Sequence, residues 1–86
     1  MREKIRLRQY VMTIHADEEM DDDDLTIFDV ENVVLTGEIF ERQKDRLTNQ
    51  LKHLVRGKKV DGSESVIAVT KFGWSGKLII ITVYVE

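Results

Sequence analysis

Hydrophobic and polar positions follow two different periods along this chain, and the change falls near Gly37. Before Gly37 the apolar side chains tend to recur three or four positions apart, which is the spacing of one helix face. After Gly37 they tend to alternate or to run together, which is typical of strands. The pattern therefore predicts helices in the first part of the chain and a sheet in the second.

The first segment of the chain supports two interpretations. Apolar residues from Leu7 to Ile14 have helical spacing, whereas residues 4–8 alternate between basic and apolar side chains like a short strand. We expect a helix over roughly residues 2–9, followed by an extended segment over residues 10–12.

Two further helices carry clearer start signals. Thr13 can cap a short helix through residues 14–21, because its hydroxyl can accept an unpaired backbone N–H. Thr26 and Asp29 have the spacing of a capping box, which predicts that the next helix begins after Thr26. Gly37 is placed to end that helix in a left-handed conformation.

The rest of the sequence predicts four strands, over residues 38–43, 50–60, 65–72 and 77–85. The Asp-Gly pair at 61–62 is typical of a tight hairpin turn, and Gly-Trp-Ser-Gly predicts a second turn. The last strand is apolar on both faces, which favours a central position. We therefore predict an α+β fold in which two or three N-terminal helices pack on an antiparallel meander of about four strands.

Length and composition limit the classes of protein that this chain can represent. With 86 residues, 42% of them hydrophobic, we expect a single domain over residues 1–86. The sequence has no cysteine, which excludes disulfides and cysteine-ligated metal centres. No apolar run approaches the roughly 20 residues of a membrane span, so we expect a cytoplasmic protein without membrane contact. The glycine motifs of nucleotide binding are missing, and we expect no cofactor.

Charge is distributed very unevenly. Residues 17–31 hold nine carboxylates and no base, while the other 71 residues carry a net charge of +6. Neither the register that begins at Asp17 nor the one that begins at Asp21 has the ligand spacing of an EF-hand calcium loop, and we expect no metal site. Loose binding of a divalent cation at the surface is the alternative. The carboxylates before Thr26 suit the positive end of a helix, and most of them are expected to be solvated. The alternative is an acidic helical face that binds a basic protein partner.

A basic segment follows the acidic one and offers candidate phosphate contacts. Its cations are Arg42, Lys44, Arg46, Lys52, Arg56, Lys58 and Lys59. They predict either salt-dependent binding to nucleic acid or a sheet edge protected from aberrant pairing. Tyr84 and Trp74 could stack on bases or pack within the protein. His15 is expected near the start of its helix, as a general base or as a hydrogen-bonded core residue.

Several short motifs, taken in order, resemble the bacterial family catalogued as domain of unknown function 4258. The first is His-Ala with a following methionine, represented here by His15, Ala16 and Met20. The second is the Gly-Glu-Ile segment that begins at Gly37, and the last is Ile-Thr-Val-Tyr at 81–84. The resemblance covers residues 10–85.

The element order of that family is similar to the RelE-like toxins, which are small ribonucleases neutralised by antitoxins. The resemblance implies an antitoxin-like partner, an RNA substrate and a catalytic set of His15, Lys52, Arg56 and Tyr84. The RNA-binding set would be Arg42, Lys44, Arg46, Lys58 and Lys59. The chain departs from the family at Glu19 and Asp23, where arginines are typical. The alternative is a non-catalytic protein-binding module that uses its acidic helical face. The apolar last strand is compatible with a homodimer interface as well as with a central position in the sheet.

Overall fold

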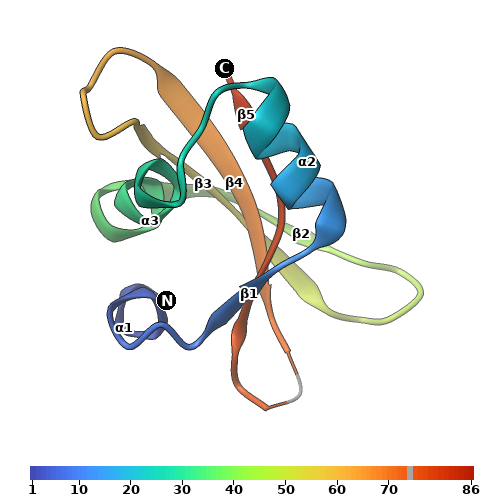
Figure 1. Cartoon of the computed structure of the whole chain (residues 1–86). Helices are drawn as coiled ribbons and strands as arrows, with labels where there is room; N and C mark the ends of the chain where they lie inside the picture. The colour runs from blue at the N-terminus through green and yellow to red at the C-terminus, as the bar shows by residue number, and fades with distance from the viewer. Residues whose placement is uncertain (74) are drawn as a thin grey trace.

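The chain folds into a helical layer and one mixed sheet (Figure 1). The computed structural model describes residues 1–73 and 75–86, so the predicted stacking role of Trp74 lies outside the described residues. The helices are α1 (Arg2–Arg6), α2 (Ile14–Asp22) and α3 (Ile27–Thr36). The strands are β1 (Tyr10–Met12), β2 (Glu38–Lys44), β3 (Leu51–Lys58), β4 (Ser65–Phe72) and β5 (Leu78–Val85).

The predicted α+β class is confirmed, but the predicted sheet is incomplete. Strands β2 to β5 form the expected antiparallel meander, and β1 adds a fifth strand in the order β1-β5-β4-β3-β2. Because β1 pairs with β5 in parallel, with Tyr10 opposite Leu78 and Met12 opposite Ile80, the sheet is mixed. The last strand is therefore flanked on both sides, as its apolar sequence predicted.

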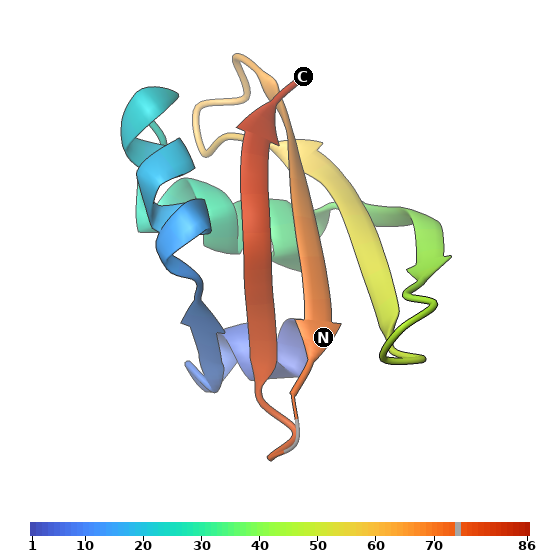
Figure 2. The same ribbon diagram turned by 90° about the vertical axis from the view of Figure 1, so that its right-hand side faces the viewer.

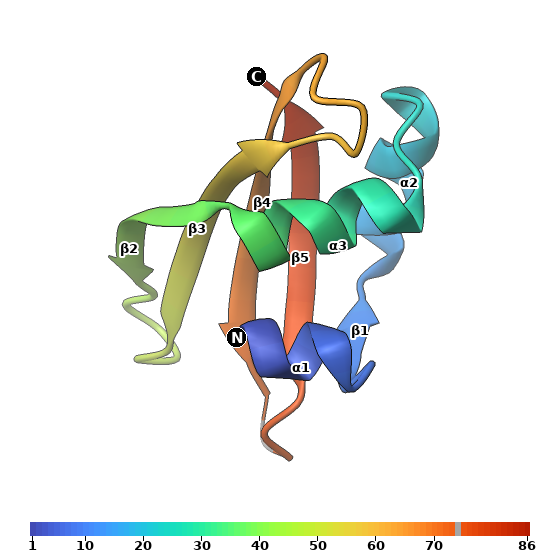
Figure 3. The same ribbon diagram turned by 90° about the vertical axis from the view of Figure 1, so that its left-hand side faces the viewer.

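The two faces of the sheet have different surroundings. Helices α1 and α3 cross one face of the sheet. Helix α2 lies above β1, beside the part of β5 that β1 does not pair with (Figure 3). Within the described residues no helix covers the opposite face, which looks toward the viewer in Figure 2. The helix-covered face holds the main core, which joins Val30, Val33 and Val34 of α3 to apolar residues of β3, β4 and β5. None of the described helices is long and apolar enough to cross a membrane.

Helix α3 begins as predicted and ends differently. Thr26 and Asp29 form the reciprocal capping box, with Asp29 N–H donating to the Thr26 hydroxyl at 3.1 Å. Gly37 follows the helix with φ −82° and ψ −175°, so the predicted left-handed conformation is wrong. The glycine is needed for space instead, because an added Cβ would lie 2.3 Å from the Val33 carbonyl oxygen and 2.4 Å from that of Arg56.

Helix α1 is shorter than the predicted 2–9. It stops at Arg6, and Arg8 adopts a left-handed φ of 55°. The chain turns there because the next residues pair with β5, where the Leu78 N–H donates to the Gln9 carbonyl oxygen at 3.1 Å. Tertiary pairing thus overrides the local helical pattern.

Candidate functional site

The uncovered sheet face brings together three of the four residues predicted to be catalytic. Arg56 of β3 lies opposite Ile67 of β4, which lies opposite Tyr84 of β5. Alternation along β3 puts Lys52 on the same face as Arg56. Because two strand spacings of about 4.8 Å separate the backbones of Arg56 and Tyr84, their side chains flank Ile67 rather than touch. Ile67 is only 2% exposed, whereas Tyr84 is 37% exposed and accessible to a ligand.

The guanidinium of Arg56 is paired with the carboxylate of Glu86. Its Nε lies 3.0 Å from Oε1 of Glu86, and its Nη2 lies 2.8 Å from Oε2. The guanidinium Cζ also lies 4.2 Å from the ring centroid of Phe40, a cation–π contact. A hollow of about 320 Å³ opens beside Arg56, and its wall includes Phe40, Lys58 and Ser65. The same N–H groups could bind two oxygens of a phosphate, but only after Glu86 is displaced.

His15 does not join this set. As predicted, it lies in the first turn of its helix, where the Thr13 hydroxyl accepts the Ala16 N–H. Its Nε2 lies 2.6 Å from Oε1 of Glu19, one turn further along α2. The same Glu19 carboxylate accepts the hydroxyl of Thr82 on β5. His15 therefore belongs to a contact between α2 and β5, and α2 lies on the other side of β5 from β3, the strand that carries Arg56 (Figure 2).

The predicted RNA-binding cations do not form one patch. Register and alternation put Lys58 on the uncovered face, and Arg42 and Lys44 on the opposite face of the β2–β3 hairpin. Arg46 lies in the turn between β2 and β3. Lys59 lies outside the strands and pairs with Glu64 at 3.8 Å. The basic side chains of this hairpin are thus divided between the two faces of the sheet.

Part of the acidic segment is structural rather than solvated. Glu31 accepts the Tyr10 hydroxyl at 2.6 Å, and Asp23 accepts the Val85 N–H at 3.2 Å. The remaining carboxylates of α2 and of the turn that follows it are largely exposed, namely Asp17, Glu18, Asp21, Asp22 and Asp24. No group of three metal-ligating side chains occurs within residues 1–73 and 75–86.

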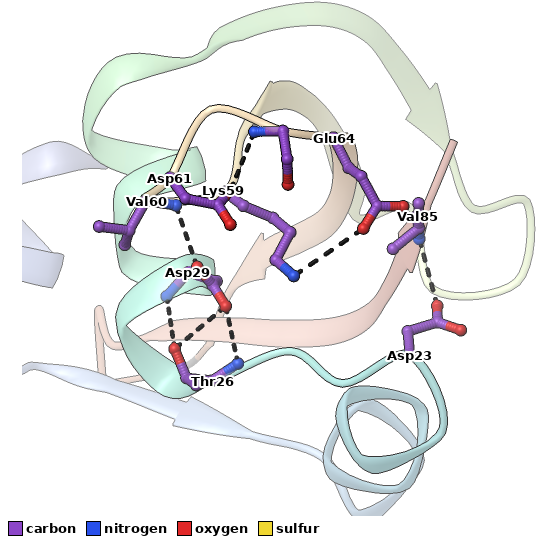
Figure 4. A network of polar contacts seen from close by, with 9 residues as sticks. Asp23, Thr26, Asp29, Lys59, Val60, Asp61, Glu64 and Val85 are labelled. Atoms are coloured by element: carbon purple, nitrogen blue, oxygen red, sulfur yellow. Dashed lines mark hydrogen bonds and ion pairs between the residues drawn. The ribbon is translucent and has the colours of Figure 1, made fainter.

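Asp29 is the centre of a network that ties α3 to the β3–β4 connection (Figure 4). Its Oδ2 accepts the Thr26 N–H at 3.0 Å, and its Oδ1 accepts the Val60 N–H at 3.0 Å. Burial alone would raise the pKa of Asp29, but the hydrogen bonds from Thr26 and Val60, together with the charge of Lys59, outweigh burial and lower it. The sequence predicted the capping role of Asp29, but its bond to Val60 depends on the tertiary arrangement.

His53 is a residue whose environment the sequence did not reveal. It lies opposite Arg42 on the helix-covered side, and its ring meets the edge of Phe72 with centroids 6.2 Å apart. Its Nδ1 is buried and lacks a hydrogen-bond partner among the described residues. Burial, followed by the nearby Arg42 guanidinium, lowers the pKa of His53. Arg42, His53 and Phe72 lie on three different strands, so their proximity can be predicted only when the register of those strands is known.

The fold and this site define a small α+β protein whose sheet has one helix-covered face and one face without a helix, on which Arg56 and Tyr84 flank the buried Ile67. Residues 12–85 match the family described as Domain of unknown function (DUF4258), and the chain belongs to that family. No curated protein and no solved structure matches the chain.

Proposed function

We propose that this chain is a toxin-type ribonuclease of the RelE-like kind and that it acts on RNA with the uncovered face of its sheet. The observation that carries the proposal is the shared face of Lys52, Arg56 and Tyr84, where the Arg56–Glu86 ion pair is exposed and a phosphate can displace the carboxylate. Phosphoryl-transfer catalysis rests largely on positioning and on stabilising charge at the phosphate, which these side chain types supply.

Each residue has a separate role in the proposed cleavage. The RNA 2′-hydroxyl gives its proton to solvent, its oxygen bonds to the neighbouring phosphorus, and the bond from phosphorus to the 5′-oxygen breaks. The leaving 5′-oxygen takes a proton from water, which leaves a 2′,3′-cyclic phosphate and a 5′-hydroxyl. The hydroxyl of Tyr84 orients the attacking 2′-hydroxyl, and Arg56 stabilises the charge that develops on the phosphate. Lys52 stands four residues from Arg56 along β3, about 13 Å at the backbone, so it binds a neighbouring phosphate. We assign His15 no part in cleavage, because it is paired with Glu19 beyond β5.

The proposal is tested by cleavage of a labelled RNA with purified protein. We expect Arg56→Ala to lower the cleavage rate by roughly a hundredfold or more, as removal of a transition-state charge partner commonly does. Tyr84→Phe, which removes only the hydroxyl, should lower the rate without loss of fold. Arg6→Ala is the matched control, because Arg6 is an exposed cation at the far end of α1. Equal rates for wild type, Arg56→Ala and Tyr84→Phe would refute the proposal.

A second candidate is the non-catalytic binding module. It is favoured by the exposed acids of α2 and the following turn, which have no ion-pair partner within the described ranges. Asp17, Glu18, Asp21 and Asp22 would meet a basic partner, and such binding weakens with salt. Binding of a basic peptide that is lost in an Asp21→Asn/Asp22→Asn variant, with no RNA cleavage by wild type, would favour this function. For a toxin, the same acidic surface is a candidate binding site for a neutralising partner.

A further inference from the structure

A second surface lies on the helix-covered side of the sheet, where the β2–β3 hairpin extends past the helices (Figure 3). Arg42 lies opposite His53, and Lys44 lies opposite Leu51, so all four side chains share one face. The ring of Phe72 meets the His53 ring edge to face, at an interplanar angle of 75°. We call these five residues the hairpin patch.

The hairpin patch combines free cations with accessible aromatic and apolar surface. Within residues 1–73 and 75–86, neither Arg42 nor Lys44 has an ion-pair partner. This differs from Arg56, whose guanidinium is occupied by Glu86. Phe72 is 41% exposed although it is a large apolar residue. The ring lies two strands from the cations, with β3 between them, and an exposed ring on the same face as unpaired cations is a combination with which proteins stack bases and neutralise phosphates.

One further feature of the hairpin patch suits a nucleotide. The next residue pair along the same strands, Ile39 and Val55, helps to line a hollow of about 500 Å³. Arg2, Glu3 and Glu38 also line this hollow, so its wall is partly apolar and partly charged. The patch therefore adjoins a recess in addition to its charge, whereas the His53 Nδ1 is buried and does not face a ligand.

We propose that the hairpin patch binds single-stranded RNA, with one base stacked on Phe72 and neighbouring phosphates held by Arg42 and Lys44. These two cations stand two residues apart on one strand, about 6.7 Å at the backbone, which suits successive phosphates of an extended strand. Because β2 is the edge strand, RNA can pass around it from this patch to the face that bears Arg56. The inference rests on the proposed function for its choice of RNA, and it places a strand-holding site apart from the cleaving residues.

The test measures the affinity of a fluorescently labelled single strand of about twelve nucleotides by anisotropy, over a range of salt concentrations. Phe72→Leu should weaken binding about tenfold, because stacking on an aromatic ring contributes on the order of 1 to 3 kcal/mol per base. Arg42→Gln and Lys44→Gln should each reduce the slope of log affinity against log salt by about 0.7. Arg6→Gln is the control, and thermal unfolding of each variant verifies the fold.

Two results would overturn the inference. One is wild-type affinity and salt slope in Phe72→Leu and Arg42→Gln when both variants are folded. The other is no binding of the strand by wild type at low salt. The separate cleavage assay distinguishes the two proposals: patch-dependent binding without cleavage refutes the ribonuclease and retains the patch. Cleavage that depends on Arg56, with binding independent of Phe72 and Arg42, refutes the patch and retains the ribonuclease.

Discussion

Replacement of Asp29 by alanine tests whether one carboxylate holds the β3–β4 connection onto α3. The side chain is 6% exposed and satisfies two backbone donors, the N–H groups of Thr26 and Val60. Loss of the cap interaction costs about 1 kcal/mol. Val60 is itself exposed, so the cost there is that of a lost hydrogen bond to a charged group, about 1 to 3 kcal/mol more. We therefore expect the free energy of unfolding to fall by about 2 to 4 kcal/mol, and Tm to fall by roughly 10 to 20 °C.

The assay is urea unfolding followed by circular dichroism, with Asp22→Ala as the control. Asp22 carries the same charge but is exposed on α2, so its replacement should change the free energy of unfolding by no more than about 0.5 kcal/mol. Equal stabilities of Asp29→Ala and Asp22→Ala, with an unchanged urea dependence, would refute the reasoning.

The same carboxylate predicts a pH dependence with a definite sign. Because folding lowers the pKa of Asp29, the unfolded chain takes up the proton first as the pH falls. The stabilisation from Asp29 is fully present above the unfolded pKa of about 3.9 and is lost as the pH falls through the folded pKa. The difference in stability between wild type and Asp29→Ala should thus be constant near neutral pH and shrink below about pH 4. A constant difference down to pH 2 or so would contradict the lowered pKa.

Three further predictions concern separate parts of the molecule. Gly37→Ala should lower the free energy of unfolding by more than about 2 kcal/mol, because its Cβ would meet the carbonyl oxygens of Val33 and Arg56 at 2.3 and 2.4 Å; thermal unfolding close to that of wild type would contradict this. Glu86→Gln should free the Arg56 guanidinium and strengthen RNA binding several-fold in the anisotropy assay, while stability changes by less than about 1 kcal/mol because the ion pair is exposed. Burial first, then the hydrogen bond and charge of Glu31, raise the pKa of Tyr10 to about 12. Ultraviolet titration should show a tyrosine ionising near pH 12 that Tyr10→Phe removes, and stability should decline between the unfolded pKa of about 10 and that value.

Local signals were sufficient for the parts of this fold that depend on neighbouring residues. The caps at Thr13 and Thr26 and the strand from Ser65 to Phe72 have short-range physical causes, and the structure confirms them. The parallel pairing of β1 with β5 has no such signal, because three residues carry little pattern and their partner lies at the other end of the chain. Gly37 illustrates the same limit in part, since one of the two carbonyls that require a glycine belongs to Arg56 on β3, while the other belongs to Val33 in the preceding helix.

The candidate site divides along the same line. Alternation within β3 was enough to put Lys52 and Arg56 on one face, whereas the addition of Tyr84 required the register of three strands. The sequence predicted that the basic segment forms one surface, because its residues are close together along the chain. In a hairpin, however, successive side chains point to opposite faces of the sheet. His53 gave no signal, because its burial and its neighbours Arg42 and Phe72 arise only from tertiary packing.

The pairing of β1 with β5 also determines the order in which this molecule can fold. Tyr10 and Leu78 are separated by almost the whole described chain, and closing a loop of that length costs several kcal/mol of chain entropy before any contact compensates for it. The hairpins β2–β3, β3–β4 and β4–β5 join neighbouring segments and can form earlier. During synthesis, β1 is made before β5 and must wait for β5 to emerge. Substitutions in β1 should accordingly speed unfolding and leave the folding rate nearly unchanged, the kinetic signature of a strand that docks last.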